Sequence, residues 1–146
     1  MTSLGRSRSR AVMITAMIVG ITACLKSTEP QPSLLALSGV WNYSGVQTGP
    51  VRETLSGTLT ISRESGTSFQ GRLDLVGQNS QTGESRLLSG LVSGSLAGTN
   101  TVDFDADLEA PRRHVGQITA DTITGTWVES SGGMSSGTFR IEREPK

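Results

Sequence analysis

Few residues in this chain have the types and spacing that catalysis needs. Its 146 residues include one cysteine, Cys24, and one histidine, His114. A nucleophile activated by histidine would need a recognisable serine or cysteine motif, and the chain has none. One histidine and one cysteine also fall short of the usual zinc ligand sets. The sequence therefore predicts no catalytic residue, no metal site and no enzyme, and it predicts that His114 is a rim or structural residue.

Three acidic residues at alternate positions, Asp103, Asp105 and Asp107, form the sharpest charged feature. Such a string resembles the start of a calcium-binding loop, but that loop needs glycine at its sixth position and glutamate at its twelfth. Here those positions hold Leu108 and His114. On a strand the three carboxylates would lie about 7 Å apart, too far to share an ion without other ligands. We expect a solvated outer face that pairs with arginines of neighbouring strands.

The adjacent arginines Arg112 and Arg113 form a second charged feature. A guanidinium group suits anion recognition, because its planar donors match the oxygens of a carboxylate or phosphate. An arginine pair beside a turn is more often a solubilising strand end. We expect the strand end here.

The residues before Cys24 have the pattern of an export signal. Arg6, Arg8 and Arg10 precede an uncharged, mostly apolar stretch over residues 11–21, and small residues lead up to Cys24. A basic start, a short apolar middle and small residues at the cut site are typical of a secretory signal. The apolar run is about half of the roughly 20 residues that a membrane-spanning helix needs. An unpaired thiol in an oxidising compartment also disfavours ordinary secretion.

With cysteine closing that pattern, Ile21-Thr22-Ala23-Cys24 resembles the lipobox of bacterial lipoproteins. The resemblance implies that residues 1–23 are removed and that Cys24 becomes the first mature residue. It also implies diacylglyceryl and N-acyl groups such as palmitate on Cys24, which would attach the protein to a membrane. Leu25 is not the aspartate that retains enteric lipoproteins in the inner membrane, so the expected address is the outer membrane, on its periplasmic or surface face.

Cleavage would leave 123 residues, which is enough for one domain. Three of the 13 basic residues precede Cys24, so the mature chain would have 10 basic and 13 acidic residues. This balance argues against nucleic acid as a partner, because nucleic-acid binding needs a basic patch. Residues 24–37 include Pro30 and Pro32 and read as a flexible tether. Residues 38–146 form the single predicted domain.

From residue 37 onward, apolar and polar residues alternate with the period of a β-strand, and glycine-rich turns interrupt them. For example, the side chains of Val102, Phe104 and Ala106 share one face of their strand, and those of the three aspartates at 103, 105 and 107 share the other. The pattern predicts an all-β domain of eight segments: Gly39–Val46, Glu53–Ser62, Ser68–Val76, Arg86–Leu96, Thr101–Leu108, Arg112–Ala120, Asp121–Glu129 and Ser135–Arg143.

A short repeat of a small residue, glycine, threonine and a bulky residue recurs around Gly57, Gly125 and Gly137. In each copy the glycine shares the apolar face. An inward glycine lets a strand coil tightly, as sheet closure requires. Eight antiparallel strands with short turns and inward glycines predict an up-and-down meander barrel, with a β-sandwich as the alternative.

The start of the first segment, Gly39-Val40-Trp41, resembles the Gly-x-Trp opening of lipocalins and, more loosely, of avidins. The resemblance implies a barrel of the calycin type. It also implies that Trp41 closes one end and packs under a basic side chain of the last strand, Arg140 or Arg143. The extra tryptophans of the avidin biotin site are absent from this chain, so the resemblance carries the architecture and no particular ligand.

All six large aromatic side chains share the inward face and are candidates for lining a ligand site: Trp41, Tyr43, Phe69, Phe104, Trp127 and Phe139. They could form a cup for a small apolar ligand, or they could simply fill the barrel, because eight strands enclose space for side chains or one small ligand. The sequence leaves both open. It predicts a non-catalytic binding or structural module of the cell envelope, with a lipocalin-like carrier as the alternative and an envelope protein as a further possible partner.

Overall fold

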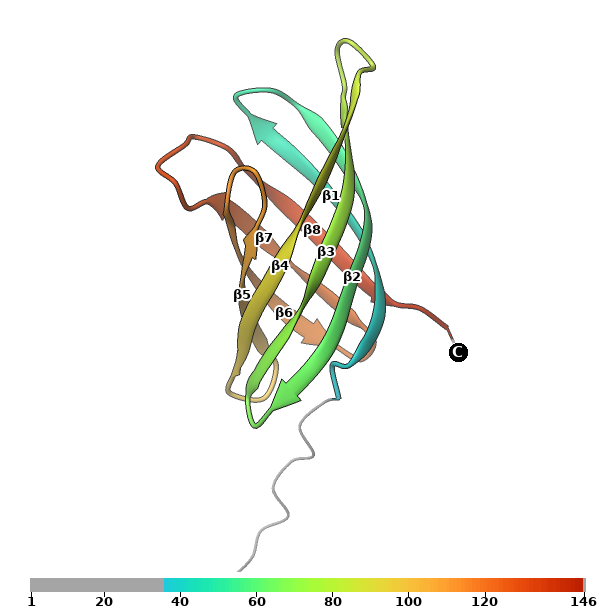
Figure 1. Cartoon of the computed structure of the whole chain (residues 1–146), viewed down its shortest axis with the longest axis vertical. Coiled ribbons are helices and arrows are strands. Elements are labelled where there is room, and N and C mark those ends of the chain that lie inside the picture. Colours follow the sequence, from blue (N-terminus) through green and yellow to red (C-terminus); the bar gives the residue numbers. More distant parts are fainter. Residues whose placement is uncertain (1–35, 146) are drawn as a thin grey trace, which may run out of the picture.

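The computed structural model describes residues 36–145, and these residues form a closed eight-stranded β-barrel (Figure 1). Each strand pairs antiparallel with the next, and β1 pairs with β8 to close the sheet. The strands are β1 (Gly39–Gly49), β2 (Glu53–Ser65), β3 (Ser68–Asn79), β4 (Ser85–Ala97), β5 (Thr101–Asp107), β6 (Arg112–Thr119), β7 (Thr122–Glu129) and β8 (Ser136–Arg143). The predicted all-β meander barrel is confirmed, and the sandwich alternative is wrong. The predicted signal peptide, Cys24 and most of the tether lie outside the described residues.

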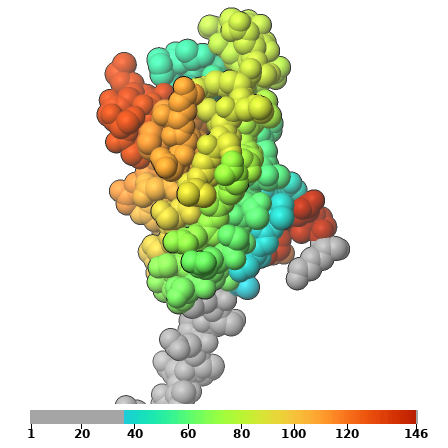
Figure 2. Space-filling model, in the orientation of Figure 1, coloured from blue at the N-terminus to red at the C-terminus, as the bar shows by residue number. Residues whose placement is uncertain are grey.

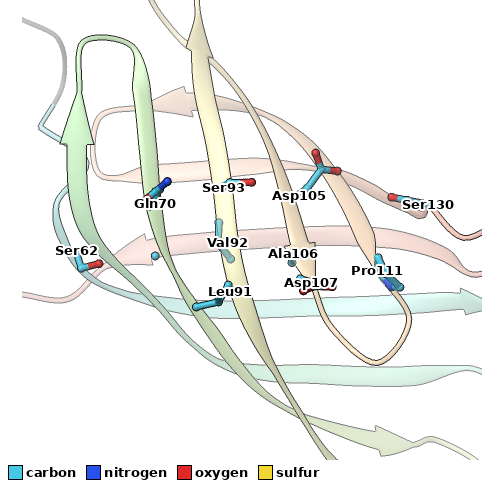
Figure 3. A pocket seen from close by; sticks show the side chains of 11 residues that line it. Ser62, Gln70, Leu91, Val92, Ser93, Asp105, Ala106, Asp107, Pro111 and Ser130 are labelled. Carbon is cyan, nitrogen blue, oxygen red and sulfur yellow. The ribbon is translucent and has the colours of Figure 1, made fainter.

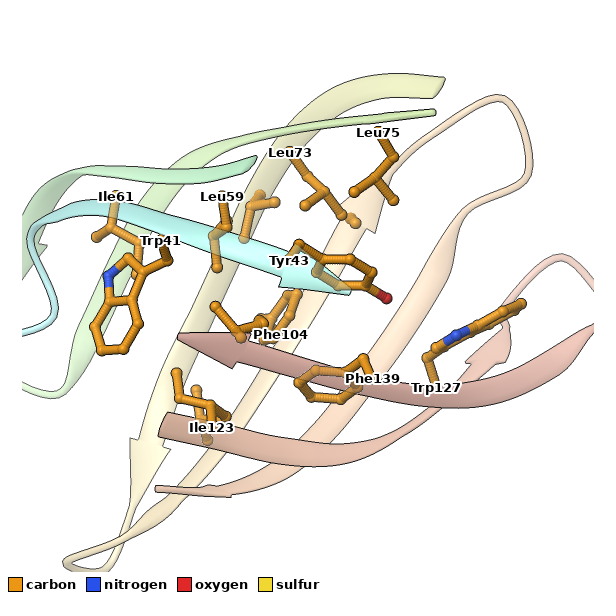
Figure 4. Packing of buried hydrophobic residues seen from close by; sticks show 14 of the residues in the cluster. Trp41, Tyr43, Leu59, Ile61, Leu73, Leu75, Phe104, Ile123, Trp127 and Phe139 are labelled. Carbon is orange, nitrogen blue, oxygen red and sulfur yellow. The ribbon is translucent and has the colours of Figure 1, made fainter. Parts of the chain in front are cut away.

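Burial alternates along the strands as the sequence predicts. On β5, Val102, Phe104 and Ala106 are buried, and the three aspartates between and beyond them face outward. All six aromatic residues named above are buried inside the barrel. Figure 4 labels Trp41, Tyr43, Phe104, Trp127 and Phe139 among the aliphatic core residues. The core cluster and both neighbours of every strand lie within residues 36–145.

The repeated inward glycines lie where neighbouring strands approach closely. A Cβ atom built on Gly57, Gly125 or Gly137 would lie 2.0 Å from a carbonyl oxygen of the adjacent strand. Backbone atoms cannot move aside as a flexible side chain can, so only glycine fits at these positions. The repeat therefore marks points where the sheet coils tightly enough to close.

One end of the barrel is plugged by residues from both ends of the described chain. The guanidinium carbon of Arg143 lies 4.1 Å from the centre of the Trp41 ring, and the Trp41 indole Nε1 donates to the Leu37 carbonyl at 2.8 Å. Arg143 also donates to the carbonyls of Ala36 and Ser38. The basic residue that covers Trp41 is thus Arg143, and Arg140 points outward to Glu142. We call this region the plugged end.

Leu37 is buried at the plugged end, and its backbone N–H donates to the Glu64 carboxylate. Leu37 therefore packs against the plugged end just before β1 begins at Gly39. The opposite end, which we call the mouth, carries the β1–β2, β3–β4, β5–β6 and β7–β8 connections (Figures 1 and 2). No helix within residues 36–145 is long and apolar enough to cross a membrane.

Candidate functional site

Buried polar side chains in the barrel gather in the half nearer the mouth. The buried polar residues of the described chain are Gln47, Glu53, Arg112 and His114, and the Tyr43 hydroxyl joins them. Gln47 lies near the mouth end of β1, Glu53 begins β2 and Arg112 begins β6. The half that contains Trp41, Ile61, Val102 and Ile141 is apolar by contrast. We call Tyr43, Gln47, Arg112 and His114, together with Trp127, on which Arg112 stacks, the mouth cluster.

Arg112 lies inside the barrel, so the expected solubilising strand end is wrong for this residue. Its exposed fraction is 2%, because it alternates in phase with His114 along β6 and therefore faces inward. Arg113 faces outward and binds the Asp103 carboxylate with two hydrogen bonds, at 3.0 and 2.6 Å. These hydrogen bonds hold the pKa of Asp103 below its usual range. The two adjacent arginines thus have opposite surroundings.

The Arg112 guanidinium stacks on Trp127, with its central carbon 4.1 Å from the ring centre. Its Nη2 donates to the Gln47 side-chain oxygen at 3.2 Å, and its Nε and Nη1 have no hydrogen-bond partner among residues 36–145. The Trp127 indole Nε1 has no partner in this part of the chain either. Gln47 in turn donates through Nε2 to the Val51 carbonyl at 3.0 Å, which connects Arg112 to the β1–β2 connection.

No carboxylate of residues 36–145 lies within ion-pair distance of Arg112. The buried carboxylate at this end, Glu53, is already held by Arg86 through hydrogen bonds of 3.0 and 2.7 Å. Burial lowers the pKa of Arg112, but an arginine stays protonated in proteins. The mouth cluster therefore holds one buried positive charge without a counter-charge in contact, which is a costly arrangement.

His114 is completely buried and uncharged. Its ring stacks on Phe104 with centres 4.4 Å apart and planes 6° apart, and its Nε2 lies 3.3 Å from the Tyr43 hydroxyl oxygen. Burial lowers the pKa of His114 to about 3 and raises that of Tyr43, so both are neutral at pH 7. Of the rim and structural roles expected for His114, the structure shows the buried, structural one.

The structure brings four of the six candidate lining residues together around His114. Tyr43, Phe104, Trp127 and Phe139 have ring centres 4.4–6.4 Å from that of the histidine. Phe69 packs on the far side of Phe104, and Trp41 belongs to the plugged end. A Cβ atom on Gly94 would lie 2.5 Å from both Phe69 and Phe104. The rings thus occupy the space that inward glycines leave.

The largest groove described lies on the outer wall, over β3, β4 and β5 (Figure 3). Its volume is about 610 Å³, and Gln70, Leu91, Ser93, Asp105 and Asp107 contribute to its lining. The aspartates lie on the outer face, as the sequence predicts, and Asp103 pairs with an arginine of the next strand. Within residues 36–145, no group of three or more acidic, histidine or cysteine side chains is placed to hold a metal ion.

No protein-family model matches this chain, and no curated protein matches it in sequence. Its fold is similar to that of designed β-barrels. A redesigned barrel, mFAP1, bound to DFHBI, is 13% identical with a TM-score of 0.59, and the match covers 73% of this chain and 94% of that one. A de novo designed fluorescence-activating β-barrel is 16% identical with a TM-score of 0.54, covering 73% and 93%. At these identities the likeness concerns the fold alone.

Proposed function

We propose that this chain is a lipid-anchored module of the bacterial cell envelope, attached through Cys24, whose barrel binds a small ligand at the mouth. The observation that carries the binding role is the asymmetry of the barrel interior. One end is sealed by Leu37, Trp41 and Arg143, and the other holds buried donors that lack partners in the part of the chain that the structure describes. Buried polar groups in proteins nearly always have partners, so such groups point to a missing ligand or water.

The proposed anchor would determine which end of the barrel lies nearer the membrane. Ala36, the first described residue, lies at the plugged end, so a chain running from a lipidated Cys24 would join the barrel there (Figure 1). The mouth would then face away from the membrane to which the acyl chains attach. An outer-membrane address, expected from Leu25, is part of the same proposal.

Two further observations support a non-catalytic role and a shallow site. His114, the one histidine, is fully buried and has a strongly lowered pKa, so it is poorly suited to exchange protons with a substrate. Aromatic rings pack into the positions that inward glycines such as Gly94 and Gly116 leave open, which argues against a ligand carried deep inside the barrel. Designed barrels of similar fold are bound to DFHBI, which shows that the architecture accommodates small molecules.

Thermal unfolding of the full-length chain in a neutral detergent tests the binding role. Tryptophan emission would follow unfolding while two uncharged or weakly charged probes, 2-naphthol and DFHBI, are added. A probe that binds the folded barrel raises the unfolding midpoint, and at 100 times its Kd it adds about 2.7 kcal/mol of stability. We expect a saturable rise with at least one probe. A midpoint that neither probe changes at any concentration would contradict the binding role and favour a purely structural module.

A further inference from the structure

The unpaired donors of the mouth cluster define what could bind there. Arg112 is 2% exposed, and within residues 36–145 its Nε and Nη1, the Nε1 of Trp127 and the Nδ1 of His114 lack hydrogen-bond partners. The arginine and indole nitrogens are donors, so a group that satisfies them must be an acceptor, whereas His114 Nδ1 donates or accepts according to its tautomer. Because the Arg112 guanidinium is charged and without a carboxylate partner among residues 36–145, a negatively charged acceptor would also compensate it.

The number of charges at the mouth sets the charge of the ligand. Arg86 neutralises Glu53 through two hydrogen bonds, and the buried His114 and Tyr43 carry no charge at pH 7. Glu129, the β7 residue paired with Arg112 in the sheet, also attracts Arg112 electrostatically, but it forms no ion pair with it. Among residues 36–145, Arg112 therefore offers one positive charge that no carboxylate contacts. A monoanion would cancel that charge, whereas a dianion such as hydrogen phosphate would bury an excess negative charge.

The surroundings of Arg112 indicate the shape of the ligand's anionic group and the polarity of its remaining part. Its guanidinium is planar and stacks on Trp127, and the aromatic rings of Tyr43 and Phe139 stack on each other deeper in the barrel. A carboxylate matches planar donors with its two oxygens. The adjacent aromatic surface would favour an apolar body over a second polar group.

We propose that the mouth cluster binds a small monocarboxylate, with its carboxylate on Arg112 and Trp127 and its apolar part against the neighbouring rings. This inference rests on the proposed binding function and names its ligand class. Since the Arg112 side chain is almost fully buried, the ligand has to displace a group that contacts it. Gln47 is the one described residue that is hydrogen-bonded to the guanidinium, so it is the competing group.

The indole N–H resonances of the two tryptophans allow a test by NMR, in which Trp41 serves as the internal control for Trp127. The chain has two indole N–H groups: that of Trp41 donates to Leu37, and that of Trp127 has no acceptor within residues 36–145. The full-length, ¹⁵N-labelled chain in a neutral detergent would be titrated with sodium benzoate, and a Trp127→Phe variant would assign the resonances. We expect a saturable downfield shift of the Trp127 indole proton and no shift for Trp41. Sodium hexanoate in parallel distinguishes an acyl from an aromatic body.

Benzamide, sodium phosphate and sodium chloride at matched ionic strength are the comparison ligands, and each should bind at least tenfold more weakly than benzoate. Arg112→Met removes the charge at similar volume and should weaken benzoate binding at least tenfold. Arg113→Met is the matched control, since it removes the same charge from an exposed neighbour, and it should bind benzoate normally. If Arg112→Met does not fold, Arg112→Lys replaces it, and the loss of the planar donors should still weaken binding severalfold.

Equal binding of benzamide and benzoate, reproduction of the shift by phosphate or chloride, or unchanged binding in the Arg112 variants would each overturn the monocarboxylate assignment. The binding function would survive those results if 2-naphthol or DFHBI still raised the unfolding midpoint. If no carboxylate, neutral compound or dye acted on the chain, both proposals would fail together.

Discussion

The Arg143 guanidinium covers the Trp41 ring at 4.1 Å and at the same time donates to two carbonyls of the segment that enters the barrel. This one side chain therefore joins the first strand, the last strand and the entering segment at the plugged end. Its side chain is 23% exposed, and it also pairs with Asp121 of the β6–β7 turn at 3.1 Å. A stacked and forked contact of this kind depends on the planar guanidinium rather than on charge alone.

Replacing Arg143 by alanine should lower the free energy of unfolding by about 1–3 kcal/mol. A cation–π contact of a partly desolvated arginine contributes about 0.5–2 kcal/mol, and the lost hydrogen bonds add to it. Arg143→Lys should recover only part of the loss, because an ammonium group cannot reproduce the stacked fork. Urea unfolding followed by tryptophan emission measures both variants.

Arg140→Ala is the matched control for this substitution. Arg140 lies three residues earlier on β8, is exposed, and forms an ion pair with Glu142 on the same strand. Exposed pairs contribute little, so this variant should stay within about 0.5 kcal/mol of the parent. Equal losses for the two arginines would mean that the plug is not held by Arg143.

His114 should make the barrel less stable as the pH falls from about 6.5 toward 3. Its pKa is about 3 in the folded barrel and near the ordinary 6.5 when unfolded. Between those values the unfolded chain binds the proton and the folded chain does not, so stability rises with pH across this window. The slope is at most about 1.4 kcal/mol per pH unit.

The comparison variant is His114→Phe, which keeps a ring against Phe104 and cannot bind a proton. It leaves the Tyr43 hydroxyl without its partner, a loss that is the same at every pH in the window. The free energy of unfolding of this variant should therefore depend less steeply on pH between 4 and 6. Parallel curves for parent and variant would show that His114 is not the titrating group.

Replacing an inward glycine by alanine should destabilise the barrel by overpacking. Gly125→Ala would place a Cβ atom 2.0 Å from the Val115 carbonyl oxygen, so the strands must separate locally. Overpacking of this kind typically costs about 1–3 kcal/mol. Gly77→Ala is a fair control, because its Cβ would meet only side-chain atoms, at 3.3–3.6 Å. If chemical denaturation gave both variants the same stability, the close strand approach at Gly125 would not be real.

The alternation of side chains carried most of the fold prediction. Each segment has one clear apolar face, as β5 shows with Val102, Phe104 and Ala106, and a period of two leaves little freedom in assigning the inward side. The glycine repeat then favoured a barrel over a sandwich, and the carbonyl contacts of Gly57, Gly125 and Gly137 give the physical reason. Closure itself depends on pairing between β1 and β8, which no local pattern encodes.

The candidate site was harder to predict, because residue type and strand phase disagreed at Arg112. Arginines are rarely buried, so residue type favoured the surface. The phase that placed His114 inward also applied to Arg112 two residues earlier, and it was the better guide. Gln47 gave no comparable signal, since its role arises from contacts with Arg112 on β6 and with Val51 in the next connection.

The proposed anchor leads to the last prediction, which concerns Cys24 and stands apart from the barrel. In a bacterial host with lipoprotein processing, the parent chain should incorporate radiolabelled palmitate and lose residues 1–23. Cys24→Ser should block both, because the thiol is the proposed attachment point, and an uncleaved precursor should accumulate. Two or three acyl chains give stable attachment, since each buried methylene contributes about 0.8 kcal/mol. The barrel fold should be unaffected, so Trp127 emission of the variant should match that of the parent. Palmitate incorporation into Cys24→Ser, or cleavage at an unchanged position, would exclude Cys24 as the lipidation site.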